Sequence, residues 1–235
     1  YGLENLALIP GQVGSAPVQN IGAYGVEQCD FFHSLEGYRI STGEKLHWTK
    51  EECQFGYRDS IFKHSLRGDF FITRVTYKLD KVWTPNRSYK ELDTELKKFE
   101  FEFINQDADY VLQTVSRIRR QKLPDTNEFG NAGSFFQNPL VSAEIYEKLK
   151  SDYPNCPAYA IDNGMFKIPA AWLIEGAGWK GKRIGDAGVY EKHALIIVNH
   201  GNASGEDIFS LSEQVIRSVH EKYGIELERE VNWVI

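Results

Sequence analysis

Ser134 is the first residue of this sequence whose type and setting suggest chemistry. It lies in the stretch NAGSFFQNP (131–139), directly after Gly133 and before two phenylalanines. A serine in such a turn is a nucleophile, a phosphate ligand or a proton donor, or its hydroxyl simply caps the backbone of the turn. The serine-hydrolase pattern G-x-S-x-G does not fit, because residues 132–136 read AGSFF. The local pattern alone therefore favours the capping role.

Cationic side chains form the second group of candidates. Arg58, in CQFGYRDSIFKH, either pairs with Asp59 or holds a carboxylate or phosphate through its planar guanidinium. Four more cations gather near the end of an expected helix: Arg117, Arg119, Arg120 and Lys122. They either compensate the helix dipole or form an anion site for a nucleotide diphosphate. Charge alone favours dipole compensation.

Two further segments carry polar or flexible residues that can serve a ligand. The loop PGQVGSAPVQNIGAYG (10–25) has glycines that let backbone approach a ligand, but it lacks Walker A and the strand–GxGxxG–helix context. Near the end of the chain, Glu230 shares the polar side of an alternating segment with Glu226 and Glu228. Solvent exposure explains all three glutamates, so periodicity singles out none of them.

Composition narrows the class of protein. The 235 residues are 42% hydrophobic and carry a formal net charge of −6, which argues against nucleic-acid binding. No apolar stretch has the length of a membrane span, and the six histidines and three separated cysteines lack metal-ligand spacing. We therefore expect a reduced, cytoplasmic protein with no metal. The first residue is Tyr1 and the only methionine is Met165, so we expect part of a longer protein.

The first half of the chain is predicted to be rich in strands and then helical. A hairpin is expected over 31–49, and a strand over 69–79 with Phe71 and Val75 on the same face. Helices are expected over 90–99 and 107–121, the second with an apolar stripe that includes Leu112.

The second half mixes short elements. Expected in order are a helix near 142–151, a hairpin with Asn163-Gly164 at type I′ positions, a helix over 169–177 and a buried strand over 195–198. A helix over 204–223 follows, with a capping box at Ser204 and Asp207. The alternating segment 225–235 is expected to be a closing strand. This order predicts an α+β fold with two lobes.

Taken together, six spaced stretches resemble one enzyme family. They read ENLALIPGQVGSAPVQNIGAYG, CQFGYRDSIFK, RRQKLPD, GNAGSFFQNP, AAWLIEGAGWKG and LEREV. In this order they are similar to the UDP-N-acetylenolpyruvoylglucosamine reductases, the MurB flavoenzymes of bacterial peptidoglycan synthesis. The resemblance covers essentially the whole chain, and SYKEL around Tyr89 resembles the type I form of the family.

The resemblance implies a domain arrangement. Residues 1–123 correspond to the second lobe of a vanillyl-alcohol-oxidase-type FAD-binding domain, to which 225–235 returns. Residues 124–224 correspond to the domain that binds the UDP sugar. The first FAD lobe of the family precedes the glycine loop, so we expect it to be missing from this chain. A monomer with no nucleic-acid or membrane partner is expected.

The resemblance also implies a reaction. NADPH reduces FAD, and a hydride then reaches C3 of the enolpyruvyl group of UDP-N-acetylglucosamine enolpyruvate, giving UDP-N-acetylmuramate. Ser134 is implied to donate a proton to C2. Arg58 and Glu230 are implied to stabilise the enolate-like intermediate.

Binding residues are carried over position by position. Those implied to hold the UDP sugar are Tyr89, Arg119, Lys122, Asn138 and Lys167. Those implied to contact the flavin are Gly14, Ser15, Asn20, Ile21, Gly22, Ala23 and Gly25. The chain departs from some relatives at Asn232, where they have a basic residue, and at Gly178, where they have glutamine. Both positions lie near the substrate site of the family.

Two other classes of function compete with the reductase. A chain that lacks the first flavin lobe can bind the UDP sugar without turnover, and retention of flavin separates this reading from the reductase. A serine acyl-transferase or hydrolase built on Ser134 would be labelled by an active-site serine reagent, but the sequence around Ser134 argues against it.

Overall fold

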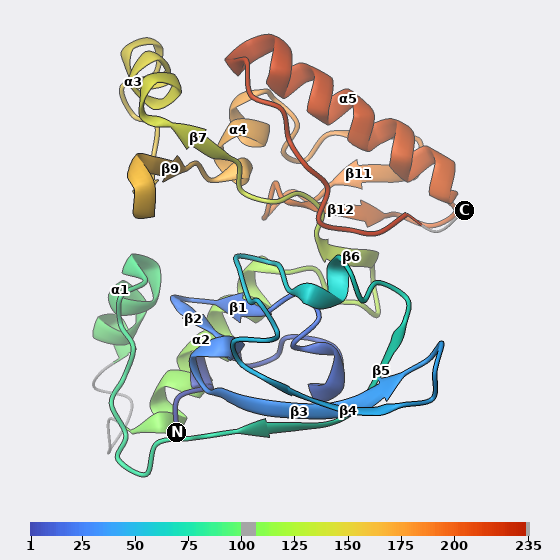
Figure 1. Ribbon diagram of the computed structural model, residues 1–235. Helices are drawn as coiled ribbons and strands as arrows, with labels where there is room; N and C mark the ends of the chain where they lie inside the picture. The colour runs from blue at the N-terminus through green and yellow to red at the C-terminus, as the bar shows by residue number, and fades with distance from the viewer. Residues whose placement is uncertain (100–106, 234–235) are drawn as a thin grey trace. The chain divides into compact units, whose positions relative to one another are not determined.

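The structure, a computed structural model, describes residues 1–99 and 107–233 (Figure 1). The chain divides into two compact units, Tyr1–Gln121 and Lys122–Ile235, which we call the first and the second unit. Each unit contains both helices and strands, which confirms the predicted α+β class.

The first unit is built on a three-stranded antiparallel sheet in the order β4-β3-β5. Its elements are β1 (Gly22–Ala23), β2 (Val26–Glu27), β3 (Phe32–Arg39), β4 (Lys45–Thr49), β5 (Phe70–Tyr77), α1 (Lys90–Phe99) and α2 (Ala108–Lys122), of which the last residue belongs to the second unit. The predicted hairpin over 31–49 is confirmed as β3 and β4. One face of the sheet packs on a core around Leu35, Trp48 and Phe62.

A β-bulge in β5 changes the predicted face of one residue. Glu36 pairs with Arg74 and the next residue, Gly37, pairs with Ile72, so Thr73 is an extra residue on β5. Because a bulge reverses the alternation of side chains, Phe71 is 63% exposed whereas Val75 packs against the core. The prediction that both residues share one face is therefore wrong.

The two predicted helices of the first unit are confirmed as α1 and α2. Their apolar sides meet in a small core that contains Leu92 and Leu96 from α1 and Val111 and Val115 from α2. Leu112, expected in the buried stripe, is 42% exposed, because it lies at the edge of the apolar arc of α2.

The second unit contains two antiparallel sheets, in the orders β10-β11-β12-β6 and β7-β9-β8. Its elements are β6 (Gly130–Ser134), β7 (Leu140–Ser142), α3 (Ala143–Asp152), β8 (Tyr159–Ala160), β9 (Met165–Lys167), α4 (Ala170–Gly176), β10 (Arg183–Ile184), β11 (Ala187–Val189), β12 (Ile196–Asn199) and α5 (Gly205–Tyr223). Helix α5 packs on β11 and β12 through Leu211, Val215 and Val219 (Figure 1).

Local signals in the second unit predicted its turns and caps correctly. Asn163 (φ 63°) and Gly164 (φ 72°) both adopt the left-handed conformation that a type I′ turn between β8 and β9 requires. Ser204 and Asp207 form the reciprocal capping box of α5, and Gly224 ends the helix with φ 67°.

The expected closing strand is not formed. Residues 225–233 are irregular apart from a single bridge between Arg229 and Phe136, and residues 234–235 lie outside the described part of the chain. Ile225 and Leu227 are buried in the core of the second unit, so the alternation holds at the start of the segment. Within the described part of this segment, two backbone hydrogen bonds join it to residues 135–137, from Gln137 N to Glu228 O and from Glu230 N to Phe135 O.

Candidate functional site

Ser134 lies at the end of β6, on a turn that its neighbours shape. Gly133 adopts φ 74°, and its amide donates to the Asn131 side chain at 3.0 Å. Ser134 itself is exposed and pairs with Ile196 of β12. Among the residues that the structure describes, none is hydrogen-bonded to the Ser134 hydroxyl. The capping role favoured by the local pattern is therefore not observed.

Glu230 is brought to the residue that follows Ser134. The Glu230 amide donates to the carbonyl oxygen of Phe135 at 2.9 Å. The half-buried Glu230 therefore lies beside the residue that directly follows β6. Two of the three predicted catalytic residues, Ser134 and Glu230, thus come from adjacent backbone segments of the second unit although they are far apart in sequence. Periodicity did not distinguish Glu230 from Glu226 and Glu228, which are both exposed.

Asn138 and Lys167 lie at neighbouring positions in the second unit. The Asn138 side-chain oxygen accepts from the Ala170 amide at 2.9 Å and so caps the start of α4. Lys167 pairs with Leu140, and the next amide, Ile168, donates to Pro139 at 3.0 Å. The structure therefore brings these two predicted substrate ligands together at the start of α4.

Lys122, the last residue of α2, precedes Leu123. The Leu123 side chain packs with Tyr190, Ile196 and Val198. Ile196 is the residue that pairs with Ser134. Lys122 is thus the direct chain neighbour of Leu123, which packs against β12, the strand that pairs with Ser134.

Arg58 belongs to the first unit and holds an unusual backbone conformation. Its φ of 54° lies in the left-handed region, which costs on the order of 1–3 kcal/mol for a residue other than glycine and recurs at functional sites. Its guanidinium donates to the Gly22 carbonyl at 2.7 Å, and Lys63 Nζ donates to the Arg58 carbonyl at 2.8 Å. The Asp59 carboxylate binds His64 Nε2 at 2.7 Å. Arg58 is thus joined to the predicted flavin loop.

Asn20 holds the glycine loop together from within. Its side chain is fully buried and donates to Glu27 Oε2 at 2.7 Å and to the Gly56 carbonyl at 2.9 Å. Its oxygen accepts from Gln28 Nε2 and from the Cys29 amide. With both ends of the amide engaged, Asn20 serves the loop as a structural anchor, which its sequence pattern does not reveal.

The glycines of the loop differ in whether contacts within the chain exclude a side chain. A Cβ on Gly22 would come within 2.8 Å of Glu27 Cγ, and one on Gly25, which has φ 81°, within 2.4 Å of Ser88 Oγ. These two positions are explained by contacts inside the chain. A Cβ on Gly14 would meet only Ile72, at 3.9 Å, and its φ is ordinary. Packing within the chain therefore does not require a glycine at position 14, which belongs to the predicted flavin set.

The remaining members of the flavin set are held by local bonds. Ser15 Oγ donates to the Gln12 carbonyl at 2.8 Å, which closes a short 3-10 helix. Ile21 donates to Ala16 and accepts from Gln28 through its backbone. Ala23 pairs with Val26 across the β1–β2 turn.

Tyr89 and Arg119 both lie around Tyr24, which the sequence had not singled out. The Tyr24 and Tyr89 rings meet edge to face with centroids 5.4 Å apart. Burial raises the pKa of Tyr24 to about 12, and the nearby Arg119 guanidinium opposes this rise. Arg119 donates weakly to the Leu8 carbonyl at 3.4 Å, and burial lowers its own pKa. The tyrosine in GAYG was the available signal for this cluster.

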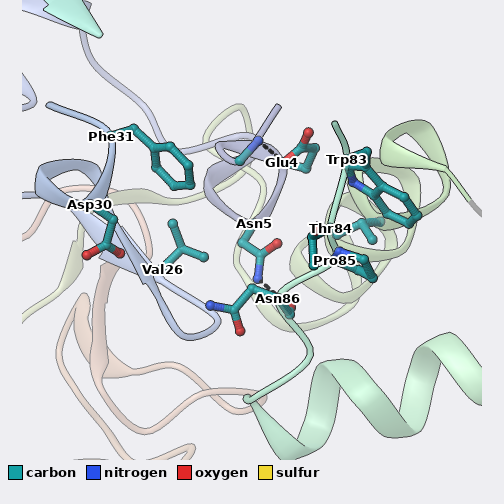
Figure 2. Close-up of a pocket in the computed structure, with 11 residues that line it drawn as sticks. Glu4, Asn5, Val26, Asp30, Phe31, Trp83, Thr84, Pro85 and Asn86 are labelled. Atoms are coloured by element: carbon teal, nitrogen blue, oxygen red, sulfur yellow. Dashed lines mark hydrogen bonds between the residues drawn. The ribbon is translucent and has the colours of Figure 1, made fainter. Parts of the chain in front are cut away.

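The first unit also contains a cavity of about 200 Å³ (Figure 2). Its lining includes Asn5, Phe31 and Trp83, and none of the predicted site residues is among the described residues that line it. Its two carboxylates accept backbone bonds, Glu4 from Gly2 and Asp30 from Glu27, both at 2.8 Å. These bonds complete local turns, so the acidic groups of the cavity serve the fold.

Metal and membrane features are not found in the described ranges. Within 1–99 and 107–233, no cluster of three or more histidine, cysteine or carboxylate side chains is arranged to hold a metal ion. Over the same residues, no helix combines the length and the apolar character that crossing a membrane requires.

Comparison with known proteins connects this arrangement to one family. Residues 124–234 match the family described as UDP-N-acetylenolpyruvoylglucosamine reductase, C-terminal domain. The UDP-N-acetylenolpyruvoylglucosamine reductase of Paraburkholderia xenovorans (strain LB400) is 46% identical over 229 residues, which are 97% of this chain and 66% of the relative. That of Burkholderia pseudomallei (strain K96243) is 46% identical with the same coverage. The chain thus spans just under two thirds of the length of these curated relatives.

A solved structure agrees. The crystal structure of UDP-N-acetylenolpyruvylglucosamine reductase (MurB) from Thermus caldophilus is similar with a TM-score of 0.62 and 28% identity. The match covers 99% of this chain and 64% of that one. The chain belongs to the UDP-N-acetylenolpyruvoylglucosamine reductase family and carries its C-terminal domain.

Proposed function

We propose that the protein reduces UDP-N-acetylglucosamine enolpyruvate to UDP-N-acetylmuramate, with FAD as cofactor and NADPH as the source of hydride. The observation that supports this most directly is the hydrogen bond from the Glu230 amide to Phe135, which places Glu230 next to the residue after Ser134. An exposed serine and a half-buried glutamate on adjacent backbone segments suit proton delivery to a substrate carbon.

FAD is proposed to contact the glycine loop of the first unit. Gly14 supports this, because neither its backbone conformation nor packing within the chain demands glycine, whereas a ligand that approaches closely does. The side chains of Ser15 and Asn20 are committed to internal bonds, so they support the loop. When bound, FAD accepts hydride from NADPH and supplies it to C3 of the enolpyruvyl group.

Ser134 is proposed to donate a proton to C2 of the substrate. A hydroxyl gives up its proton reluctantly, so it requires a strongly basic carbon and a stabilised product. Such proton delivery typically contributes about 10²–10⁴-fold to the rate. Glu230 and Arg58 are proposed to stabilise charge on the carboxylate side of the substrate. The net change adds one hydride and one proton across the C2–C3 double bond and oxidises NADPH.

The UDP sugar is proposed to be held by Tyr89, Arg119, Lys122, Asn138 and Lys167. The capping bond from Asn138 to α4 fixes its carboxamide, and the pairing of Lys167 with Leu140 fixes the backbone of that lysine. A lysine ammonium is a compact charge that suits a diphosphate.

The two half-reactions test this proposal. Bound flavin is reduced with NADPH in the absence of oxygen, and UDP-N-acetylglucosamine enolpyruvate is then added while the flavin absorbance is followed. Return of the oxidised spectrum with this substrate, and not with UDP-N-acetylglucosamine, supports the reductase. If the protein binds the UDP sugar but keeps no flavin, a UDP-sugar-binding function without turnover replaces the proposed reductase activity.

A further inference from the structure

Glu230 is held beside Ser134 by few backbone contacts. Between the buried Leu227 and the end of the described chain, the segment makes a single bridge and two backbone hydrogen bonds to residues 135–137. Two backbone hydrogen bonds do not by themselves fix a segment to the precision that catalysis requires. Side-chain contacts must therefore add to them: Val231 packs against the core of the second unit, and the Trp233 ring lies 4.9 Å from the Phe209 ring of α5, centroid to centroid.

Arg229, directly before Glu230, adds three contacts of its own to α5. Its Nε donates to the Ser212 hydroxyl oxygen at 2.9 Å, and its guanidinium also forms an ion pair with Glu213. Its Cζ lies 4.5 Å from the centroid of the Phe209 ring. Three contacts of different kinds on one helix fix the direction of the guanidinium as well as its distance.

The anchor on α5 is itself rigid. Ser212 is fully buried, and its hydroxyl donates to the Phe209 carbonyl at 2.7 Å, so its lone pair is oriented toward Arg229. The helix is closed at its start by the capping box and lies on the core of the second unit. Glu213 is the weakest part of the anchor, because its side chain is 45% exposed and its ion pair is screened by water.

We propose that Arg229 is a positioning residue that holds Glu230 beside Ser134 by clamping residues 228–230 to α5. The inference rests on the proposed function, since Glu230 and Ser134 are the reacting pair assigned there. Arg229 touches neither substrate nor cofactor in this account. The sequence signal was its place directly before Glu230 in LEREV.

The first test compares Arg229→Met with Arg229→Lys in the flavin-loaded protein. Methionine keeps much of the length and loses the guanidinium, so reoxidation of reduced flavin by the UDP sugar should slow by about 10–100-fold, as expected for a small misplacement. Reduction by NADPH should stay within about twofold, because that half-reaction does not use Glu230. Lysine restores the charge opposite Glu213 and should recover part of the loss. Arg217→Met, at an exposed position of α5, is the matched control and should change neither half-reaction.

A double variant separates positioning from general stability. If Arg229 acts through Glu230, adding Arg229→Met to Glu230→Gln should slow reoxidation no further than Glu230→Gln alone. Losses that multiply, or equal slowing of both half-reactions, would overturn the inference.

Amide exchange tests the clamp without any activity. In Arg229→Met the amides of Glu230 and Gln137 should exchange about tenfold faster or more, while the amide of Val215 in α5 keeps its protection. Unchanged exchange at Glu230 overturns the clamp. Because exchange does not depend on turnover, it decides the inference even if the wild-type protein fails the test of the proposed function.

Discussion

Gly14→Ala should weaken flavin binding while it leaves the free energy of unfolding unchanged or raises it. A Cβ at this position meets only Ile72, at 3.9 Å, which is ordinary contact, and Gly14 has no left-handed φ. Replacing such a glycine with alanine lowers the conformational entropy of the unfolded chain. The free energy of unfolding should therefore stay the same or rise by about 0.4–1 kcal/mol.

Flavin binding should weaken in the same variant. If FAD packs against the loop at Gly14, the added methyl group overfills the contact, which typically costs about 1–3 kcal/mol. Such a cost raises the Kd for FAD by roughly 5–150-fold. Titration with FAD, followed by quenching of flavin fluorescence, measures the Kd, and chemical denaturation without FAD measures the stability.

Two other glycines serve as matched controls. Gly205→Ala, where the Cβ meets the Trp233 ring at 3.8 Å, should leave the Kd for FAD unchanged. Gly22→Ala should destabilise the first unit by about 1–3 kcal/mol, because its Cβ meets Glu27 Cγ at 2.8 Å and the Val26 carbonyl at 3.0 Å. A Gly14→Ala variant that binds FAD as tightly as wild type refutes the assignment of Gly14 to the cofactor contact. A wild-type protein that binds no FAD refutes the cofactor assignment as a whole.

Three further predictions concern other sites. Ser134→Ala should leave flavin reduction by NADPH nearly unchanged and slow reoxidation by the UDP sugar by about 10²-fold or more, which stopped-flow absorbance resolves; equal slowing of both would exclude the proton-donor role. Asn20→Ala should lower the free energy of unfolding by about 3 kcal/mol or more, because the fully buried Asn20 side chain serves four buried or partly buried hydrogen-bond partners; a loss below 1 kcal/mol in urea denaturation would contradict its role as an anchor. Burial raises the pKa of the Cys53 thiol from 9.0 to about 12. The stability that the protonated thiol contributes is therefore fully present below pH 9 and is lost as the pH rises toward 12. In the folded protein at pH 8, thiol reagents should label Cys29 before the buried Cys53.

Sequence patterns predicted the local structure well wherever a few neighbouring residues determine it. The left-handed residues Asn163 and Gly164 set the β8–β9 turn, and Ser204 with Asp207 set the start of α5, because each signal acts over a few residues. These features need no knowledge of the rest of the chain.

Predictions failed where a distant segment decides the structure. The side on which Phe71 points depends on an extra residue opposite β3, and alternation within β5 cannot reveal it. The alternating residues 225–233 form no strand, because their partner segment 135–137 offers only one bridge. The internal bonds of Asn20 could not be predicted either, because its partner Gly56 comes from a distant turn, and its contact with flavin stays a prediction.

The candidate site shows the same division. Motif resemblance selected Ser134 and Glu230, and the structure adds that their backbones are adjacent. The motifs GAYG and LEREV contain Tyr24 and Arg229, but the contacts of Tyr24 with Tyr89 and of Arg229 with Ser212 join distant segments, so the sequence did not reveal them.

The contact between residues 135–137 and 228–230 joins the beginning and the end of the second unit's sequence. Closing so long a loop is entropically unfavourable until the intervening sheet and helices have formed, so this contact should be among the last to assemble. A small molecule bound there would then be linked to the folding equilibrium of the whole unit. At 100 times its Kd, a ligand that binds only the folded form adds about 2.7 kcal/mol of stability. A shift in melting temperature would thus report occupancy of the site even in a variant that cannot turn over.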